Sequence, residues 1–182
     1  MAAPRQGSIA GPTARIQGEE YMMPEQTIEA RGRPAELLLI EDNHGDVLLV
    51  REAFQSAKIR NNLSVANDGE EALAMLRRCG VHAKRTAPDL ILLDLNLPGM
   101  DGREVLQTIK NDPALKRIPV IVLTSSKAEI DVLKTYDLRA NGYIVKPVNF
   151  ERLQDIVASL ETFWFSVVVL ARSHAMELAF AP

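Results

Sequence analysis

Short apolar runs alternate with amphipathic stretches along the chain from about residue 35 to residue 162. The run at residues 37–40 has no polar position, which is typical of a strand buried on both faces of a sheet. The next stretch places apolar residues three and four positions apart, as an amphipathic helix does. The same alternation recurs four more times. It predicts strands at 37–40, 63–66, 90–94, 118–123 and 142–145, and helices at 45–57, 70–78, 102–111, 128–138 and 150–163.

Strands and helices that alternate in this way, with short links, form a parallel sheet with right-handed crossovers. The predicted fold class is therefore α/β, with five strand–helix units in one domain at residues 35–162. Residues 1–34 are rich in Gly, Pro, Ala, Gln and Arg and show neither helical nor strand periodicity. We predict that they form a disordered or weakly ordered leader. Residues 163–182 form an apolar C-terminal extension.

The overall composition is that of a soluble globular protein. The 182 residues are 47% hydrophobic and 25% charged, and the formal net charge is −3. This charge offers no general attraction to nucleic acid or to an anionic membrane, so we expect neither as a partner. No apolar stretch is long enough to span a bilayer, and the N-terminus does not have the pattern of a secretory signal. We expect a cytoplasmic protein.

Carboxylates, a hydroxyl group and a lysine follow four of the five predicted strands. Glu41 and Asp42 come after the first strand, Asp94 ends the third, Thr124 follows the fourth, and Lys146 follows the fifth. In an open α/β sheet, ligands bind at the carboxyl ends of the strands. We therefore expect these side chains to converge on one edge of the sheet.

The chemistry of this group points to phosphoryl transfer onto Asp94, which enters a loop containing Pro98 and Gly99. Clustered carboxylates repel one another unless a cation joins them. Mg²⁺ suits them because it prefers oxygen ligands and binds through a few carboxylates and a phosphate. Lys146 would offer a positive charge to a phosphate oxygen. We also predict a cis peptide bond between Lys146 and Pro147.

Two other functions fit an α/β fold of this kind. An aspartate-nucleophile phosphatase of the haloacid dehalogenase type requires a second Asp two residues after the nucleophile, where this chain has Asn96. A flavodoxin-like FMN binder would need a Ser, Thr or Gly phosphate loop after the first strand. Glu41 and Asp42 stand there instead, and they would repel a phosphate in the absence of metal.

Together these residues resemble the receiver domain of response regulators in two-component signalling, over residues 35–162. The resemblance implies a flavodoxin-like fold with strand order 2-1-3-4-5, and a phospho-acceptor protein rather than an enzyme acting on an external substrate. The implied roles are these: Glu41, Asp42, Asp94 and the backbone carbonyl of Asn96 bind Mg²⁺, Asp94 accepts the phosphoryl group, Thr124 and Tyr143 form a switch, and Lys146 binds the phosphate. A receiver used only for docking, without phosphorylation, is the alternative.

More narrowly, the chain resembles the small regulators paired with bacterial phytochrome-type histidine kinases. The cues are the sequence at residues 41–43, Asp46 with Val47, the long link at residues 80–88, and Phe163 with Trp164. The resemblance implies a histidine kinase as partner, such as a bacteriophytochrome or a hybrid kinase. About 20 residues follow the last predicted helix, too few for a DNA-binding module, so we expect output through protein contact or a phosphorelay.

The apolar segment at residues 163–170 would be a liability if it were exposed to solvent. It could pack on its own domain or form the seam of a homodimer. We expect a homodimer, with Phe163, Trp164 and Phe165 as the candidate contact residues.

Overall fold

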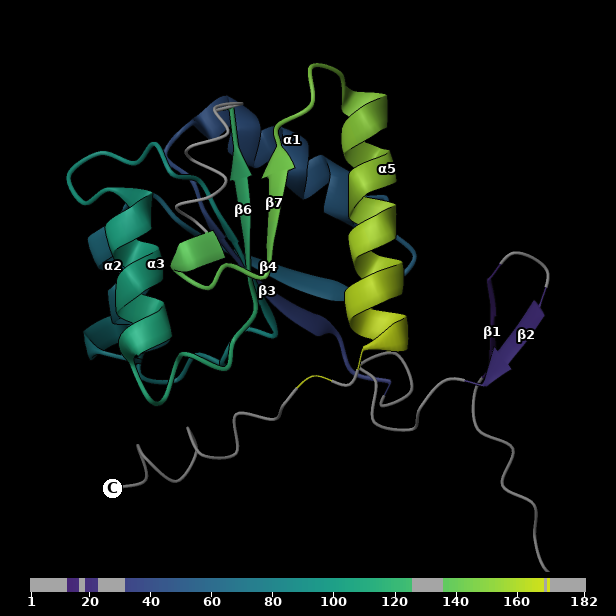
Figure 1. Ribbon diagram of the computed structural model, residues 1–182, viewed down its shortest axis with the longest axis horizontal. Coiled ribbons are helices and arrows are strands. Elements are labelled where there is room, and N and C mark those ends of the chain that lie inside the picture. Colours follow the sequence, from purple (N-terminus) through teal and green to yellow (C-terminus); the bar gives the residue numbers. More distant parts are fainter. Residues whose placement is uncertain (1–12, 17–18, 23–31, 126–135, 169, 171–182) are drawn as a thin grey trace, which may run out of the picture.

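A computed structural model describes residues 13–16, 19–22, 32–125, 136–168 and 170. Its centre is a five-stranded parallel sheet (Figure 1). The strands lie in the order β4-β3-β5-β6-β7, which is 2-1-3-4-5 when these five are counted along the chain. Their bounds are β3 Ala35–Ile40, β4 Asn61–Ala66, β5 Leu90–Leu93, β6 Val120–Thr124 and β7 Gly142–Val145. The predicted α/β, flavodoxin-like fold is confirmed.

Helices cover both faces of the sheet. Helices α2 and α3 pack on one face and α1 and α5 on the other, as Figure 1 shows. A short 3-10 turn, η1, lies within the long link after α2, and a π-helical turn, η2, continues the chain from α5. The bounds are α1 His44–Gln55, α2 Gly69–Leu76, η1 Gly80–His82, α3 Gly102–Asn111, α5 Phe150–Glu161 and η2 Thr162–Val167.

The apolar pattern of β5 shows why the third strand lies at the centre of the sheet. All four of its residues are buried. Ile91 and Leu93 face the cluster under α2 and α3, whereas Leu90 and Leu92 face the cluster under α1 and α5. Because side chains alternate between the two faces of a strand, an unbroken apolar run fits only a strand covered on both sides.

Helix α1 begins immediately beyond the carboxyl end of β3. The side chain of Asn43 accepts hydrogen bonds from the backbone N–H groups of Gly45 and Asp46 and so caps the helix. The use of Asn43 leaves the Asp42 carboxylate outside the helix cap.

One part of the chain differs from the pattern read in the sequence. Strands β1 (Thr13–Ile16) and β2 (Glu19–Met22) form an antiparallel pair within the predicted leader, where the sequence shows no strand periodicity. The helix predicted at 128–138 falls largely outside the described residues, of which Tyr136 and Asp137 are helical. The division into leader, receiver domain and extension stays a prediction.

No helix in the described part of the chain is long and apolar enough to cross a membrane.

Candidate functional site

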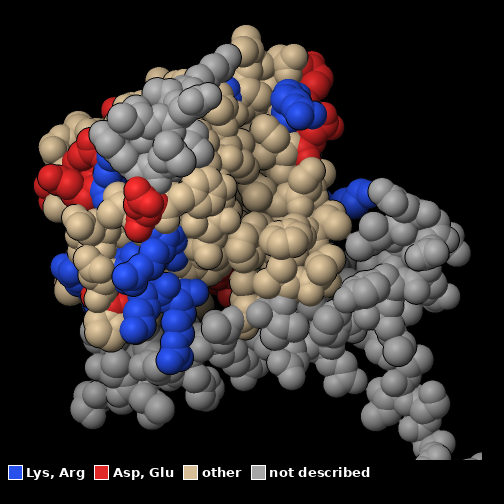
Figure 2. Space-filling model, in the orientation of Figure 1, with Lys and Arg blue, Asp and Glu red and all other residues tan. Residues whose placement is uncertain are grey.

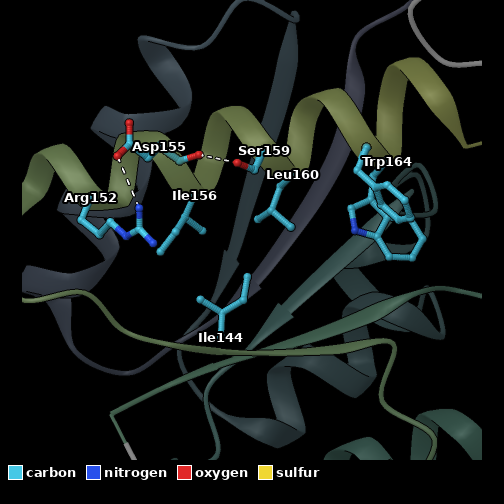
Figure 3. A pocket seen from close by; sticks show the side chains of 8 residues that line it. Ile144, Arg152, Asp155, Ile156, Ser159, Leu160 and Trp164 are labelled. Carbon is cyan, nitrogen blue, oxygen red and sulfur yellow. Dashed lines mark hydrogen bonds and ion pairs between the residues drawn. The ribbon is translucent and has the colours of Figure 1, made fainter. Parts of the chain in front are cut away.

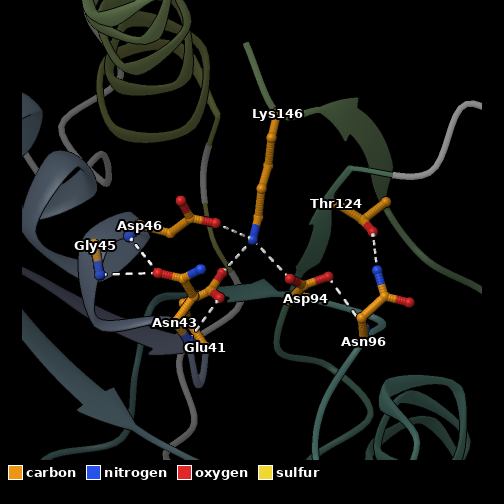
Figure 4. Close-up of polar contacts among 8 residues, drawn as sticks. All are labelled: Glu41, Asn43, Gly45, Asp46, Asp94, Asn96, Thr124 and Lys146. Atoms are coloured by element: carbon orange, nitrogen blue, oxygen red, sulfur yellow. Dashed lines mark hydrogen bonds and ion pairs between the residues drawn. The ribbon is translucent and has the colours of Figure 1, made fainter. Parts of the chain in front are cut away.

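Polar residues at three strand ends meet at the ammonium group of Lys146 (Figure 4). Its Nζ atom lies 2.6 Å from Glu41 Oε2, 2.6 Å from Asp46 Oδ2 and 2.6 Å from Asp94 Oδ2. Glu41 follows β3, Asp94 follows β5, and Lys146 follows β7. The convergence expected from the parallel sheet is present, with one further carboxylate, Asp46, contributed by the first turn of α1.

Glu41 joins the site to the start of α1. Glu41 is only 1% exposed. Oε1 accepts a hydrogen bond from the backbone N–H of Asn43, while Oε2 accepts from Lys146. Burial raises the pKa of the Glu41 carboxyl above its ordinary value, although the hydrogen bond from Lys146 acts in the opposite direction. The charge on Glu41 therefore depends on a cation close by.

Lys146 is held by its backbone as well as by its side chain. Its N–H donates to the carbonyl oxygen of Thr124 at 2.8 Å, which continues the pairing of β6 with β7. Burial alone would lower the pKa of Lys146, but the hydrogen bonds to Asp46, Asp94 and Glu41 together raise it above its ordinary value. The side chain therefore carries a positive charge at physiological pH. The peptide bond to Pro147 is trans, which corrects the prediction of a cis bond.

Asp94 presents its carboxylate at the end of the central strand and is 4% exposed. Its backbone N–H donates to the carbonyl oxygen of Ile40. Oδ1 accepts a hydrogen bond from the N–H of Asn96 at 3.1 Å, and Oδ2 accepts from Lys146. One carboxylate oxygen is thus oriented by the loop after β5 and the other by the lysine. The carboxylate is therefore held in a fixed orientation beside a positive charge.

The donor set of the site suits a cation. Three carboxylates surround the ammonium group, so the lysine marks a position where positive charge is stabilised. Asp42 is exposed at the rim. Within the residues that the structure covers, no three His, Cys, Asp or Glu side chains form a ready-made metal cluster. The lysine lies between Glu41 and Asp94, so it would compete with a metal ion for the carboxylate oxygens that it contacts.

Asp46 is the member of this group that the sequence analysis did not assign to the site. It lies in the first turn of α1, where acidic residues are common because they interact favourably with the helix dipole. The helix dipole alone therefore accounts for an acidic residue at this position. Its contact with Lys146, 100 residues away in sequence, appears only in the tertiary structure.

Comparison with known proteins identifies the group to which this arrangement belongs. The sequence profile of the response regulator receiver domain matches residues 37–158. The chain belongs to this family. As a response regulator it is a component of two-component signalling, and the resemblance noted in the sequence is confirmed.

Several response regulators are similar to this chain over most of its length. The response regulator Rcp1 of Synechocystis sp. is 45% identical over 137 residues, which cover 75% of this chain and 93% of that protein. The solved structure of the phosphorylated cyanobacterial phytochrome response regulator RcpA is 46% identical, with a TM-score of 0.73, and covers 77% of this chain and 100% of that one. Rcp1 has been solved with Mn²⁺ bound, at 45% identity and a TM-score of 0.71, covering 76% of this chain and 100% of that chain.

The two predicted switch residues of this receiver lie on one face of the sheet. Thr124 is completely buried at the end of β6, where Asn96 Nδ2 lies 3.5 Å from its hydroxyl oxygen. Tyr143 is half-buried on β7 opposite Val122, and both pack with the cluster under α2 and α3. Because Thr124 is two residues beyond Val122, its side chain points to the same face. Their roles in signalling stay predictions.

Gly102 is required where α3 begins, because a side chain there would meet the backbone at the end of β5. A Cβ atom would lie 2.2 Å from the carbonyl oxygen of Asp94 and 2.6 Å from Leu95 Cα. We expect Gly102→Ala to lower the free energy of unfolding by about 2 kcal/mol, since neither backbone can yield freely. Urea denaturation measures this change.

Gly80→Ala is the control for Gly102→Ala. Gly80 has a positive φ of 57°, but nothing lies within 4 Å of its Cβ position, so the cost should be limited to about 1 kcal/mol of backbone strain. The Gly102 variant should also accept phosphoryl groups more slowly because Asp94 is displaced, whereas the Gly80 variant should not. Equal phosphorylation rates in the two variants would show that the end of β5 tolerates a Cβ atom at position 102.

Proposed function

We propose that this receiver accepts one phosphoryl group on Asp94, in the presence of Mg²⁺, from a histidine kinase. The observation that carries the proposal is the contact of the Asp94 carboxylate with the Lys146 ammonium group at 2.6 Å. A nucleophile held against a fixed positive charge, at the carboxyl edge of a parallel sheet, suits an anionic phosphoryl donor. The phosphorylated relative RcpA supports the same function.

In the proposed reaction, one carboxylate oxygen of Asp94 forms a bond to phosphorus while the bond from phosphorus to the donor nitrogen breaks. The donor histidine leaves with the electron pair of that bond, and the product is an acyl phosphate. The Lys146 ammonium follows the transferred group and offers hydrogen bonds to its oxygens. Mg²⁺, bound by Glu41, Asp42, Asp94 and the backbone carbonyl of Asn96, would neutralise the negative charges that gather at the site.

Phosphorylation would reach the surface through Thr124 and Tyr143. The new group adds roughly one and a half to two negative charges and three acceptor oxygens next to β6. The Thr124 hydroxyl would move towards it, and Tyr143 would turn inward into the space released on the same face. This pair would be the two-state element that a local charge change biases. Slow hydrolysis by water would reset the receiver.

The proposed phosphoryl donor is a histidine kinase of the phytochrome type. This part of the proposal is based on relatives, among them Rcp1, RcpA and the bacteriophytochrome response regulator RtBRR, which is 38% identical with a TM-score of 0.63. These likenesses cover most of this chain and at least nine-tenths of each relative's own length.

Intact-mass analysis after incubation with acetyl phosphate tests the proposed chemistry. With Mg²⁺ present, the protein should gain the mass of one phosphoryl group. With EDTA in place of Mg²⁺ it should gain none, because the buried carboxylates then repel the anionic donor. An unmodified mass in Mg²⁺, in protein shown to be folded by circular dichroism, would contradict the proposal and favour a docking-only receiver.

We further propose that the face formed by α5 and β7 is the seam of a homodimer. A groove of about 330 Å³ opens on this face (Figure 3). Its apolar floor and end are formed by Ile144, Ile156, Leu160, Phe163 and Trp164. Figure 2 shows a largely uncharged surface below the charged first turns of α5. An apolar surface of this kind is typical of a protein interaction site.

The three aromatic residues predicted for the dimer have different environments. Phe163 is 54% exposed, and Trp164 is half-buried beside it, with ring centroids 5.2 Å apart. Phe165 is completely buried in the cluster under α1 and α5. The prediction for Phe165 is therefore corrected, because this side chain stabilises its own domain and is not available to a second chain.

Phe163→Glu should weaken the proposed dimer by at least tenfold in Kd, since a carboxylate would be buried without a partner. Light scattering over a range of concentrations gives the mass. Val81→Glu is the matched control, because Val81 is 94% exposed on η1 and outside the groove. A wild-type protein that stays monomeric, or a Phe163 variant that still dimerises like the control, would exclude this seam.

A further inference from the structure

Lys146 has one more carboxylate partner than the proposed chemistry uses. Glu41 and Asp94, two of its three partners, are also proposed metal ligands, whereas Asp46 is not (Figure 4). If a metal ion takes the first two carboxylates, it repels the ammonium group from both. Of the three carboxylates, only Asp46 then remains as a partner for the lysine.

The position of Asp46 suits this role. Its side chain is 33% exposed, against 1% for Glu41 and 6% for Asp94, so it lies at the outer side of the site. The cap by Asn43, whose Oδ1 accepts from the Asp46 N–H at 3.2 Å, holds the first turn of α1 in place. The positive end of the helix dipole stabilises the carboxylate charge. A lysine that swings outward therefore meets a fixed, charged acceptor.

We propose that Asp46 is a positioning residue for Lys146. It holds the ammonium group at the outer side of the site while metal occupies Glu41 and Asp94, and it releases that group to the phosphoryl oxygens after transfer. This inference rests on the proposed function of Asp94 and Lys146. It makes Asp46 the residue that sets the balance between binding of metal and binding of the phosphoryl group.

The proposal predicts opposite effects on two ligands. In Asp46→Asn, the displaced lysine loses its charged acceptor, so Mg²⁺ should bind about tenfold more weakly, as measured by calorimetry. When Mg²⁺ is saturating, the Asp46→Asn variant has no carboxylate at position 46 to hold the lysine away from a bound phosphoryl mimic. Beryllofluoride, a stable mimic of a phosphoryl group, should then bind about tenfold more tightly.

A double-mutant cycle with Lys146→Met separates positioning from simple removal of a negative charge. If Asp46 acts through the lysine, Asp46→Asn should change the two affinities by no more than about twofold when Lys146 is absent. If Asp46→Asn acted only by removing a negative charge, it would change both affinities just as much in the Lys146→Met variant. That result would overturn the proposal. If Lys146→Met does not fold, Lys146→Gln supplies the same cycle.

Two further variants complete the design. Glu52→Gln removes one negative charge from the exposed side of the same helix and should leave both affinities unchanged. Asp46→Glu keeps the charge, so both affinities should return at least halfway from the Asp46→Asn values to the wild-type values. If Asp46→Asn bound both Mg²⁺ and beryllofluoride more weakly, this would indicate a structural defect and would also overturn the proposal.

The experiment distinguishes failure of this inference from failure of the proposed function. Lysine-dependent weakening of Mg²⁺ binding, in a protein that forms no Asp94 adduct, would support the positioning role and contradict phosphorylation. A normal adduct with no lysine-dependent coupling would support phosphorylation and overturn the role of Asp46. Absence of Mg²⁺ binding to the wild type would contradict both.

Discussion

Asp94→Asn is expected to abolish the phosphoryl adduct that the wild type forms with acetyl phosphate and Mg²⁺. Asparagine keeps the shape of the side chain but replaces the nucleophilic oxygen anion by a neutral amide. It also removes one of the three carboxylates around Lys146. Since no other step can replace bond formation at this carboxylate, we expect complete loss in the intact-mass spectrum. Peptide mapping of the wild-type adduct should place the modification on Asp94.

Asp101→Asn is the matched control for this change. Asp101 lies in the same loop, but its Oδ1 accepts a hydrogen bond from the N–H of Arg103 and caps α3. Asparagine can form that cap as well, so the adduct should form at an unchanged rate. An adduct that persists in Asp94→Asn would place the acceptor elsewhere, and continuous phosphate release without any adduct would favour a phosphatase.

Lys146→Met is expected to destabilise the metal-free receiver by about 3 kcal/mol, because it leaves buried carboxylates without a counter-charge. Glu41 and Asp94 are both almost inaccessible to solvent, and methionine has a similar length but no charge. Urea denaturation in EDTA measures the loss. Added Mg²⁺ should recover part of it, since the metal restores positive charge to the same oxygens.

The loss in Lys146→Met should depend on pH in a defined direction. Burial already raises the pKa of Glu41, and removal of the lysine hydrogen bond raises it further. The folded variant then binds more protons than the unfolded chain above the ordinary carboxyl pKa, so its stability falls as pH rises through this window. The deficit should therefore be smaller at mildly acidic pH than at neutral pH.

Lys116→Met is the control, because Lys116 is exposed in the link between α3 and β6. A surface change of this kind should stay within about 0.5 kcal/mol. If Lys146→Met were as stable as this control in EDTA at neutral pH, the three carboxylates would not need the lysine. The account of the site as a charge cluster balanced by one ammonium group would then fail.

Local patterns predicted a large part of this architecture. The predicted bounds for α3, 102–111, and for β7, 142–145, agree with the structure to the residue. Apolar runs mark buried strands because alternation of side chains is a local property of the backbone. The rule that ligands bind at the carboxyl ends of parallel strands then predicts that Glu41, Asp94 and Lys146 lie at one edge of the sheet.

Other features were beyond a local reading because they depend on partners distant in the chain. The pairing of β1 with β2 has no periodic signal in the sequence. Phe165 belongs to an apolar run that could equally have faced a second chain. Only the continuation of α5 into the π-helical turn η2 places its ring in the core.

Local sequence patterns are sufficient to predict the fold class and the edge of the sheet at which the polar side chains gather. The tertiary structure alone decided how those charges are shared. Lys146 lies 105 positions from Glu41 and 100 from Asp46 in sequence. Its ammonium group can meet three carboxylates only because β3, β5 and β7 end at the same edge of the sheet, next to the first turn of α1. Residue type dictates which charges attract, but the distance between them, which sets the strength of the attraction, follows from the packing of the whole domain.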